Sequence, residues 1–471
     1  MLVVMVFAAS FTVFYRAPVR QMIDSRYLAA VSHALLHTGQ SALSDDLVPP
    51  QRVARNYQLR EMNGKIHHFY PVAPALLNVP VVAAFEVLGI SPVRADGSFN
   101  RHHENRILKL AAALVAAAIC SVLYGLGRLF LRPPATLGLV AAFALGTQIY
   151  STVSRAFWSH GWAVLLLAAG LYVLIARRPA IGRLTMIVAA TLLSWSFFSR
   201  PTMSLSILAI TALLFHRRER YLPTFVATGL AWATLLVWRS MTLFGTVLPD
   251  YFSQSNYQLG HEAAALVGNY PTAALGTLVS PGRGLFIFVP FFAWILGMVF
   301  LRRRALSEPA LAFTSITVIV AHWQLLSFFG HWTGGQSFGP RLFSDVIVWF
   351  FVLGALVLQA HAAAPLTRGK RYLAHSLLGV ALAVSLFINH RGATAWATWN
   401  WRSFERPPTL ARNNGEPLLR PAGIWNWRYP QFMAGLLPIE QELKPIGRRR
   451  RALRKGAAGE TSDLPSGQED P

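Results

Sequence analysis

Cysteine and acidic residues are scarce in this chain. Cys120 is the single cysteine in 471 residues, so disulfide bonds do not hold the fold together. Asp and Glu number 20 against 43 Lys and Arg, which gives a formal net charge of +23. In a soluble protein this excess would indicate a nucleic-acid partner. Only 13% of the residues are charged and 54% are hydrophobic, so we expect no nucleic acid and interpret the basic residues as flanking membrane spans.

Long apolar runs dominate the chain as far as His390. Several approach or exceed the roughly 20 residues that cross a bilayer, and they lack the alternating polar positions of barrel strands. Backbone groups in hydrocarbon must bond within their own segment. The sequence therefore predicts an all-α polytopic membrane protein with about 11 transmembrane helices. The expected spans are 1–15, 107–131, 135–151, 157–176, 184–198, 203–215, 222–244, 284–301, 311–329, 342–360 and 372–389.

We expect three regions. Residues 1–390 form the transmembrane domain, in which 16–106 is a first outer loop carrying surface helices. Pro71, Pro74 and Pro80 predict an amphipathic or partly inserted helix pair over 71–88 rather than a straight span. Residues 391–446 form a Trp-rich outer interfacial segment, although stacking of its aromatics on sugar rings is an alternative. Residues 447–471 have the composition of a disordered tail.

The basic connectors set the orientation. Arginine and lysine cluster in alternate connectors, near 128–132, 177–183, 217–220, 302–304 and 368–371. By the positive-inside rule these connectors face the cytoplasm, and the first loop faces outward. The basic run 448–451 departs from that rule, and one span fewer would put the tail in the cytoplasm. We expect a multi-pass protein of the cytoplasmic (inner) membrane whose active face is extracytoplasmic.

Isolated arginines lie on the expected outer face, next to glycine, proline or histidine. They are Arg155, Arg200, Arg283 and Arg341. Each alone is compatible with snorkelling at a span end. Together they indicate an anionic ligand, because guanidinium groups bind phosphate through paired hydrogen bonds. A phosphate at a membrane surface is most simply a lipid headgroup. His160, at the start of a span, is a further candidate.

Short motifs along the chain share this outer side and resemble those of a known family. The residues that carry the resemblance are DSRYLAAVSHALLHTG at 24–39, YPVAP at 70–74, SRP at 199–201, SPGRGLF at 280–286 and GGQSFGPRLF at 334–343. With these motifs in this order, the chain resembles a bacterial-type member of the GT-C integral-membrane glycosyltransferases. That group includes protein O-mannosyltransferases and the aminoarabinose transferase acting on lipid A.

The resemblance implies a glycosyltransferase whose donor is a polyprenyl-phosphate-linked sugar. It implies Asp24 as general base or acceptor organiser, and a donor site in which His160, Arg200, Arg283 and Arg341 bind the lipid phosphate. The other partners would be membrane lipid and a glycan, lipid or protein acceptor. No nucleotide-binding loop is present, as a lipid-linked donor requires none.

The chain departs from the family at the second acidic residue. The family's Asp-Glu pair is Asp24-Ser25 here, and the second outer turn has no carboxylate. Tyr27, Glu104 and His331 are candidates for the second acid or an acceptor contact. A divalent metal is not required by the sequence. His67, His68, His102, His103 and Glu104 are candidate ligands for one, with solvated loop residues as the alternative interpretation.

A second function class stays open. A transporter, flippase or non-catalytic assembly partner for a lipid-linked glycan would share the membrane architecture. Such a protein is expected to carry charges at mid-span or internal repeats. The sequence has no evident repeat, and its long outer loop favours chemistry at the surface.

Overall fold

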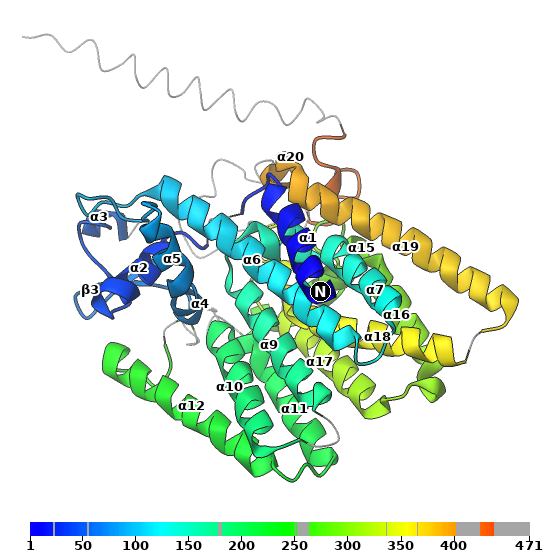
Figure 1. Ribbon diagram of the computed structural model, residues 1–471. Coiled ribbons are helices and arrows are strands. Elements are labelled where there is room, and N and C mark those ends of the chain that lie inside the picture. Colours follow the sequence, from blue (N-terminus) through cyan, green and yellow to red (C-terminus); the bar gives the residue numbers. More distant parts are fainter. Residues whose placement is uncertain are drawn as a thin grey trace, which may run out of the picture.

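The computed structural model describes residues 1–21, 24–53, 56–177, 181–249, 251, 263–335, 337–364, 366–401 and 424–437. The predicted tail at 447–471 lies outside these ranges. The described chain is mostly helical (Figure 1). Its α-helices of five residues or more are α1 Leu2–Arg16, α2 Leu28–Thr38, α4 Ala73–Leu77, α5 Val79–Val87, α6 Arg101–Gly127, α7 Pro133–Gly146, α9 Ser159–Ala176, α10 Arg183–Ser199, α11 Ser204–His216, α12 Leu222–Phe244, α14 Ala263–Val279, α16 Pro290–Arg302, α17 Pro309–Ser327, α18 Ile347–Ala363 and α19 Arg368–Thr394.

Short elements connect these helices. They are the four-residue helices α3 Pro50–Val53, α8 Gln148–Ser151, α15 Leu285–Phe288 and α20 Trp396–Trp399, the 3-10 turns η1 Val153–Arg155, η2 Pro201–Met203, η4 Arg303–Ala305, η5 Arg341–Val346 and η7 Gln431–Met433, and the strands β1 Ala42–Leu43, β2 Leu59–Met62 and β3 Lys65–His68.

Five helices in the described chain are long and apolar enough to cross a membrane. They are α6, α9, α17, α19 and the continuous Arg341–Ala363 segment that joins η5 to α18. The bent pair Pro133–Gly146 and Gln148–Arg155, which turns by 43°, makes a sixth if it is one span. The chain is therefore a multi-pass membrane protein. The remaining expected spans coincide with the helices α1, α10, α11, α12 and α16, and the total of about 11 stays a prediction.

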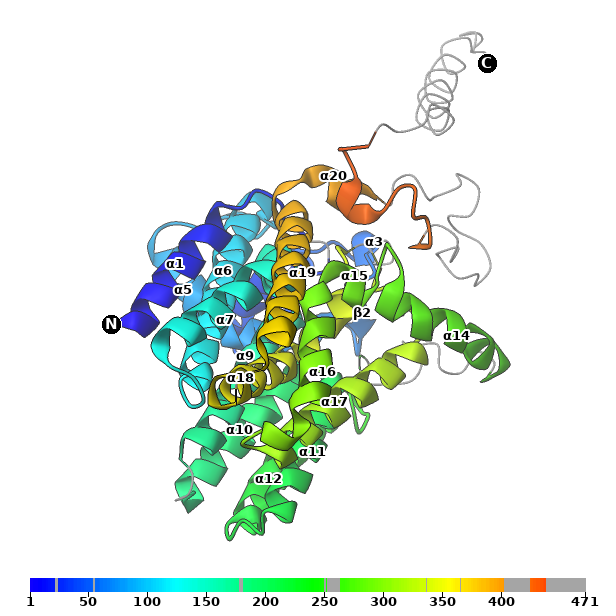
Figure 2. The same ribbon diagram turned by 90° about the vertical axis from the view of Figure 1, so that its right-hand side faces the viewer.

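Helix α18 lies at the centre of the bundle. Its composition is apolar on every side, as expected for a helix surrounded by protein, and 89% of the apolar stretch of the Arg341–Ala363 segment is buried. Phe350 stacks on Phe292 of α16 with ring centroids 4.0 Å apart, and Phe351 meets Phe143 of α7 edge to face. By contrast, α19 lies along the outside of the bundle (Figure 2), and only 22% of its apolar stretch is buried.

The predicted first outer loop forms a lobe beside the bundle (Figure 1), and it is not purely helical. A three-stranded antiparallel sheet, in the order β1-β3-β2, joins the helices α2 to α5. The all-α prediction was wrong here. Asn63 and Gly64 both have positive φ, 52° and 68°, which suits a two-residue hairpin between β2 and β3. The Asn-Gly pair is the sequence signal that identifies this hairpin.

Candidate functional site

Asp24 and Arg341 form an ion pair between the first outer loop and the turn before α18. Arg341 Nη1 lies 2.6 Å from Asp24 Oδ2. The Tyr57 hydroxyl donates a 2.5 Å hydrogen bond to Asp24 Oδ1. Both charged side chains keep a small exposed fraction, 19% for Asp24 and 15% for Arg341. A charge-assisted pair that water can still reach is suited to exchanging one partner for a charged ligand.

The backbone of the glycine-rich turn fixes the position of Arg341. Gly334, Gly335 and Gly339 all have positive φ, which is permissive for glycine and unfavourable for other residues. At Gly339 a Cβ would lie 2.6 Å from the ring of Phe288, so only glycine fits there. The Nε of Arg341 is buried and forms no hydrogen bond to any described residue. One donor of the guanidinium therefore has no partner among the described residues.

Tyrosine and histidine side chains surround Asp24. Burial, followed by the charge of Asp24, raises the pKa of Tyr57 well above its usual value. Burial and the same carboxylate also raise the pKa of Tyr70. Burial lowers the pKa of His68 to about 4, and its Nε2 lies 3.1 Å from the carbonyl oxygen of Arg26. At neutral pH these groups are uncharged hydrogen-bonding partners, so Asp24 and Arg341 supply the charge of the site.

A second buried cluster is centred on Asp345. His160 Nδ1 lies 2.8 Å from Asp345 Oδ1, and Arg200 Nε donates a 2.6 Å bond to Oδ2. Thr202 donates a further bond of 2.6 Å to Oδ2. The structure thus brings His160 and Arg200 together, but on a carboxylate. Their predicted contact with a lipid phosphate stays a prediction.

Trp158 lies between the two clusters. The guanidinium carbon of Arg341 lies 4.3 Å from the centroid of its ring, and the rings of Trp158 and His160 are 6.3 Å apart. Asp24, Arg341, His160 and Arg200 therefore belong to one neighbourhood at the same end of the bundle.

Arg283 is bound by the chain itself. Its guanidinium donates to the carbonyl oxygens of Thr333 and Gly335 and to Gln431 Oε1, at 2.5, 3.2 and 2.7 Å. These bonds fix the glycine-rich turn that carries Arg341. Arg155 is similarly occupied, since it donates to the carbonyl oxygens of Ala17 and Phe14 at the end of α1. Direct phosphate binding by Arg283 stays a prediction.

Of the three candidates for a second acid or acceptor contact, Glu104 and Tyr27 meet at the start of α2. Glu104 is buried and accepts a 3.2 Å hydrogen bond from the backbone N–H of Ala29, so it caps the start of α2. Tyr27 precedes that helix in the left-handed conformation, with its ring 4.6 Å from that of Phe99. His331 is exposed, and its carbonyl oxygen accepts a bond from Gly334 N. A catalytic role for these residues stays a prediction.

An apolar pocket of about 200 Å³ lies between the lobe and the C-terminal parts of α10 and α12. Among the residues that line it are Leu28, Tyr70, Ala73, Trp195, Trp232 and Leu235. Tyr70 connects the pocket to the ion pair, because Asp24 and Arg341 both act on it electrostatically. Arg60 and Arg239 add positive charge to the same wall. The pocket is suited to a molecule with an apolar chain and an anionic head.

Several residues of the site were not identified from the sequence. Tyr57, Trp158 and Asp345 all contact predicted site residues. Asp345 had the clearest signal, because an acidic residue in an apolar run marks a functional or paired position. The histidine candidates for a metal do not form one site. His103 Nδ1 is hydrogen-bonded to the carbonyl oxygen of Ser91, and the ring of His67 packs on that of Phe244.

Comparisons with known proteins give a distant likeness of fold. No family model matches the chain, and no curated protein matches it. The chain is similar to AglB, the GT-C oligosaccharyltransferase of Archaeoglobus fulgidus, in a complex with an inhibitory peptide and a dolichol-phosphate, at 12% identity and a TM-score of 0.48. It is also similar to the apo form of the oligosaccharyltransferase of that organism, at 12% identity and a TM-score of 0.47. Both alignments cover 87% of this chain and 58% of the archaeal chain.

Proposed function

We propose that this protein transfers a sugar from a polyprenyl-phosphate-linked donor to an acceptor hydroxyl at the outer face of the cytoplasmic membrane. Asp24 serves as general base or acceptor organiser, and Arg341 binds the lipid phosphate. The observation that carries this proposal is the 2.6 Å pair between Asp24 and Arg341, which both lie near Tyr70 of the apolar pocket.

Binding of the donor changes the partner of Arg341. The phosphate accepts hydrogen bonds from the guanidinium, including the buried Nε that no described residue occupies. The Asp24 carboxylate then gains a free oxygen for an acceptor hydroxyl, while Tyr57 still donates to the other oxygen. The polyprenyl chain lies along the apolar pocket.

In the transfer step, the acceptor oxygen attacks the anomeric carbon of the sugar. Its proton moves to Asp24, the new glycosidic C–O bond forms, and the C–O bond to the phosphate breaks. The bonding pair leaves with the phosphate, whose added charge Arg341 stabilises. Products are the glycosylated acceptor and polyprenyl phosphate, and Asp24 returns its proton to water.

The remaining site residues support this geometry. The Asp345 cluster holds His160 and Arg200 behind Trp158, and Arg283 holds the turn that carries Arg341. In this proposal His160, Arg200 and Arg283 also belong to the donor site. Tyr27, Glu104 and His331 are candidates for further acceptor contacts.

The test uses purified protein in lipid nanodiscs, polyprenyl-phosphate sugar labelled in the sugar, and a membrane extract as the source of acceptors. Asp24→Asn is expected to lower transfer at least about 100-fold, the lower range for loss of a general base. Arg341→Ala is expected to weaken binding of labelled polyprenyl phosphate, which is measured separately. Glu308→Gln is the matched control, because it disrupts an ion pair of the same 2.6 Å length with Arg217 on a basic connector.

Full transfer by Asp24→Asn would overturn the assignment of Asp24. Absence of transfer by the native protein with every polyprenyl-phosphate sugar tested, together with intact binding of the lipid, would instead favour the transporter or assembly partner.

A further inference from the structure

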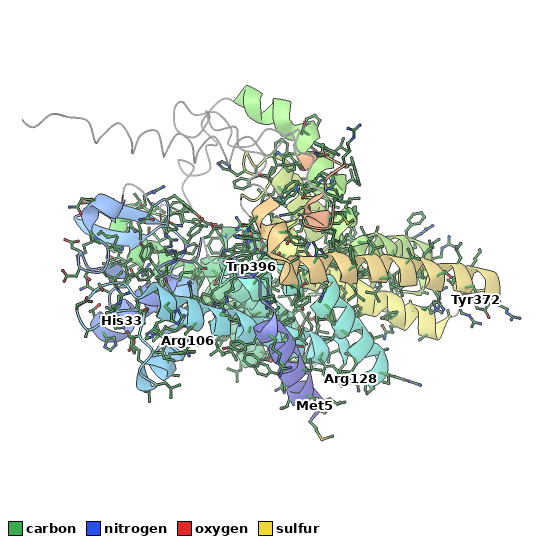
Figure 3. All side chains as sticks on the ribbon, turned by 90° about the horizontal axis from the view of Figure 1, so that it is seen from above. Met5, His33, Arg106, Arg128, Tyr372 and Trp396 are labelled. Carbon is green, nitrogen blue, oxygen red and sulfur yellow. The ribbon has the colours of Figure 1, made fainter. Side chains whose placement is uncertain are left out.

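Two histidines and a glutamate form a compact group on the lobe, apart from the ion pair of the site. His33 and His37 lie one turn apart on α2, and Glu86 lies near the end of α5. His33 Nδ1 is 2.5 Å from Glu86 Oε1, and His37 Nε2 is 2.7 Å from Glu86 Oε2. Figure 3 shows His33 within the lobe formed by the first outer loop.

The helix geometry explains this convergence. Residues four apart lie on one face of a helix, so both imidazoles project to the same side of α2. Their ring centroids are 4.4 Å apart. Because α2 packs against α5, a single carboxylate meets both rings. In the described chain, this is the one group of three or more such side chains whose ligand atoms all lie within 4.8 Å of one another.

We propose that His33, His37 and Glu86 bind a divalent transition-metal ion of the Zn²⁺ class. Zinc takes imidazole nitrogen and carboxylate oxygen at about 2.0–2.2 Å in a tetrahedral arrangement, which places neighbouring ligand atoms about 3.3 Å apart. Small rotations of the side chains bring the three ligand atoms to that spacing. Water fills the fourth position, since the side chain of His37 is 52% exposed.

The nitrogen ligands determine the class of the ion. Magnesium and calcium prefer oxygen ligands, whereas imidazole suits zinc and its neighbours in the transition series. This ion would hold α2 against α5 and take no part in chemistry at Asp24. The proposal is therefore independent of the proposed sugar transfer, and its test contains no donor.

The experiment measures zinc in the full-length protein, purified without a polyhistidine tag, stripped with a chelator and dialysed against Zn²⁺. The native protein is expected to retain about one equivalent more zinc than His37→Ala or Glu86→Gln. His102→Ala, which removes an exposed histidine of the same loop outside the group, is expected to retain the native amount. Thermal unfolding with and without zinc gives a second readout. Zinc is expected to shift the unfolding temperature of the native protein and of the His102→Ala control, but not that of His37→Ala or Glu86→Gln.

His37→Ala keeps the test decisive even if Glu86→Gln folds poorly, because the removed ring is largely exposed. Visible absorption of the Co²⁺-loaded protein reports nitrogen ligation directly, and the tetrahedral cobalt bands are expected to disappear in His37→Ala. Equal zinc in all four proteins, or no zinc in the native one, overturns the proposal.

Discussion

Arg341 lies over the face of Trp158, with its guanidinium carbon 4.3 Å from the ring centroid. An aromatic face attracts a cation by about 0.5–2 kcal/mol, depending on how far the pair is shielded from water. The indole therefore fixes the guanidinium in the orientation that donates to Asp24.

The first prediction follows from this contact. Trp158→Leu is expected to weaken binding of polyprenyl phosphate by roughly 2- to 30-fold, the equivalent of the lost attraction. Trp158→Phe keeps an aromatic face and should fall between the native protein and the leucine variant. Binding of labelled lipid in nanodiscs measures the series. Equal affinity of all three proteins contradicts a role for the ring.

The buried carboxylate of Asp345 gives a prediction on stability. Its side chain is 2% exposed and interacts with His160, Arg200 and Thr202. Removal of one member of a buried pair leaves the other charge unpaired, so Asp345→Asn is expected to lower the free energy of unfolding by about 3–5 kcal/mol.

Reversible unfolding in mixed micelles measures the change. Glu308→Gln is the control for Asp345→Asn: it breaks a more exposed pair, with Glu308 32% exposed, and should cost no more than about 1 kcal/mol. Similar losses in the two variants would show that the Asp345 cluster contributes nothing beyond a surface pair.

The apolar pocket can be filled from α12. Leu235 lines the pocket and its side chain is partly exposed, so Leu235→Trp adds bulk there without disturbing the core. We expect at least a tenfold loss of polyprenyl-phosphate binding with unchanged thermal stability. Leu230→Trp is the matched control on the same helix, because Leu230 is exposed and does not line the pocket. If both variants bind alike, the lipid chain lies elsewhere.

His68 predicts a pH dependence of stability. Burial lowers its folded-state pKa from 6.5 to about 4, so between these values the unfolded chain binds more protons than the folded one. The contribution of His68 to stability is therefore fully present above pH 6.5 and is lost as the pH falls toward 4. Because the ring is partly accessible to solvent, we expect this residue to contribute about 1–2 kcal/mol to the free energy of unfolding.

The His68→Gln variant isolates that contribution. The amide of glutamine can still donate to the carbonyl oxygen of Arg26 but does not titrate. Chemical unfolding of both proteins at pH 7.5 and pH 5 should show a smaller loss in the variant. His102→Gln, at an exposed position, should retain the native loss.

The helical architecture could be predicted from the sequence, and Asp24 and Arg341 could be singled out as isolated charges. Apolar runs of span length locate the helices because the bilayer imposes their length, and isolated charges such as Asp24 and Arg341 are conspicuous in such a chain. The partners of each charge were not predictable. His160 and Arg200 contact Asp345 because α9, η2 and η5 meet in space, and no local pattern encodes that meeting.

The lobe was predicted less well than the bundle. Its hairpin depends on positive φ at Asn63 and Gly64, which is a matter of turn chemistry rather than of hydrophobic pattern. His33, His37 and Glu86 were missed because their convergence depends on the packing of α2 on α5. Adjacent histidines such as His67 and His68 were the candidates in the sequence instead, although neighbouring side chains in a strand point to opposite faces.

The pairing of Asp24 with Arg341 joins residues 317 positions apart. A chain emerging from the ribosome therefore exposes its carboxylate long before the matching arginine has been made. Until the turn before α18 is inserted, the hydrogen bond that Asp24 accepts from the described residues of its own loop comes from Tyr57. A nascent chain released before that point has the loop and most of the pocket but not the Arg341 that completes the pair. Completion of the site thus coincides with one late step of membrane insertion.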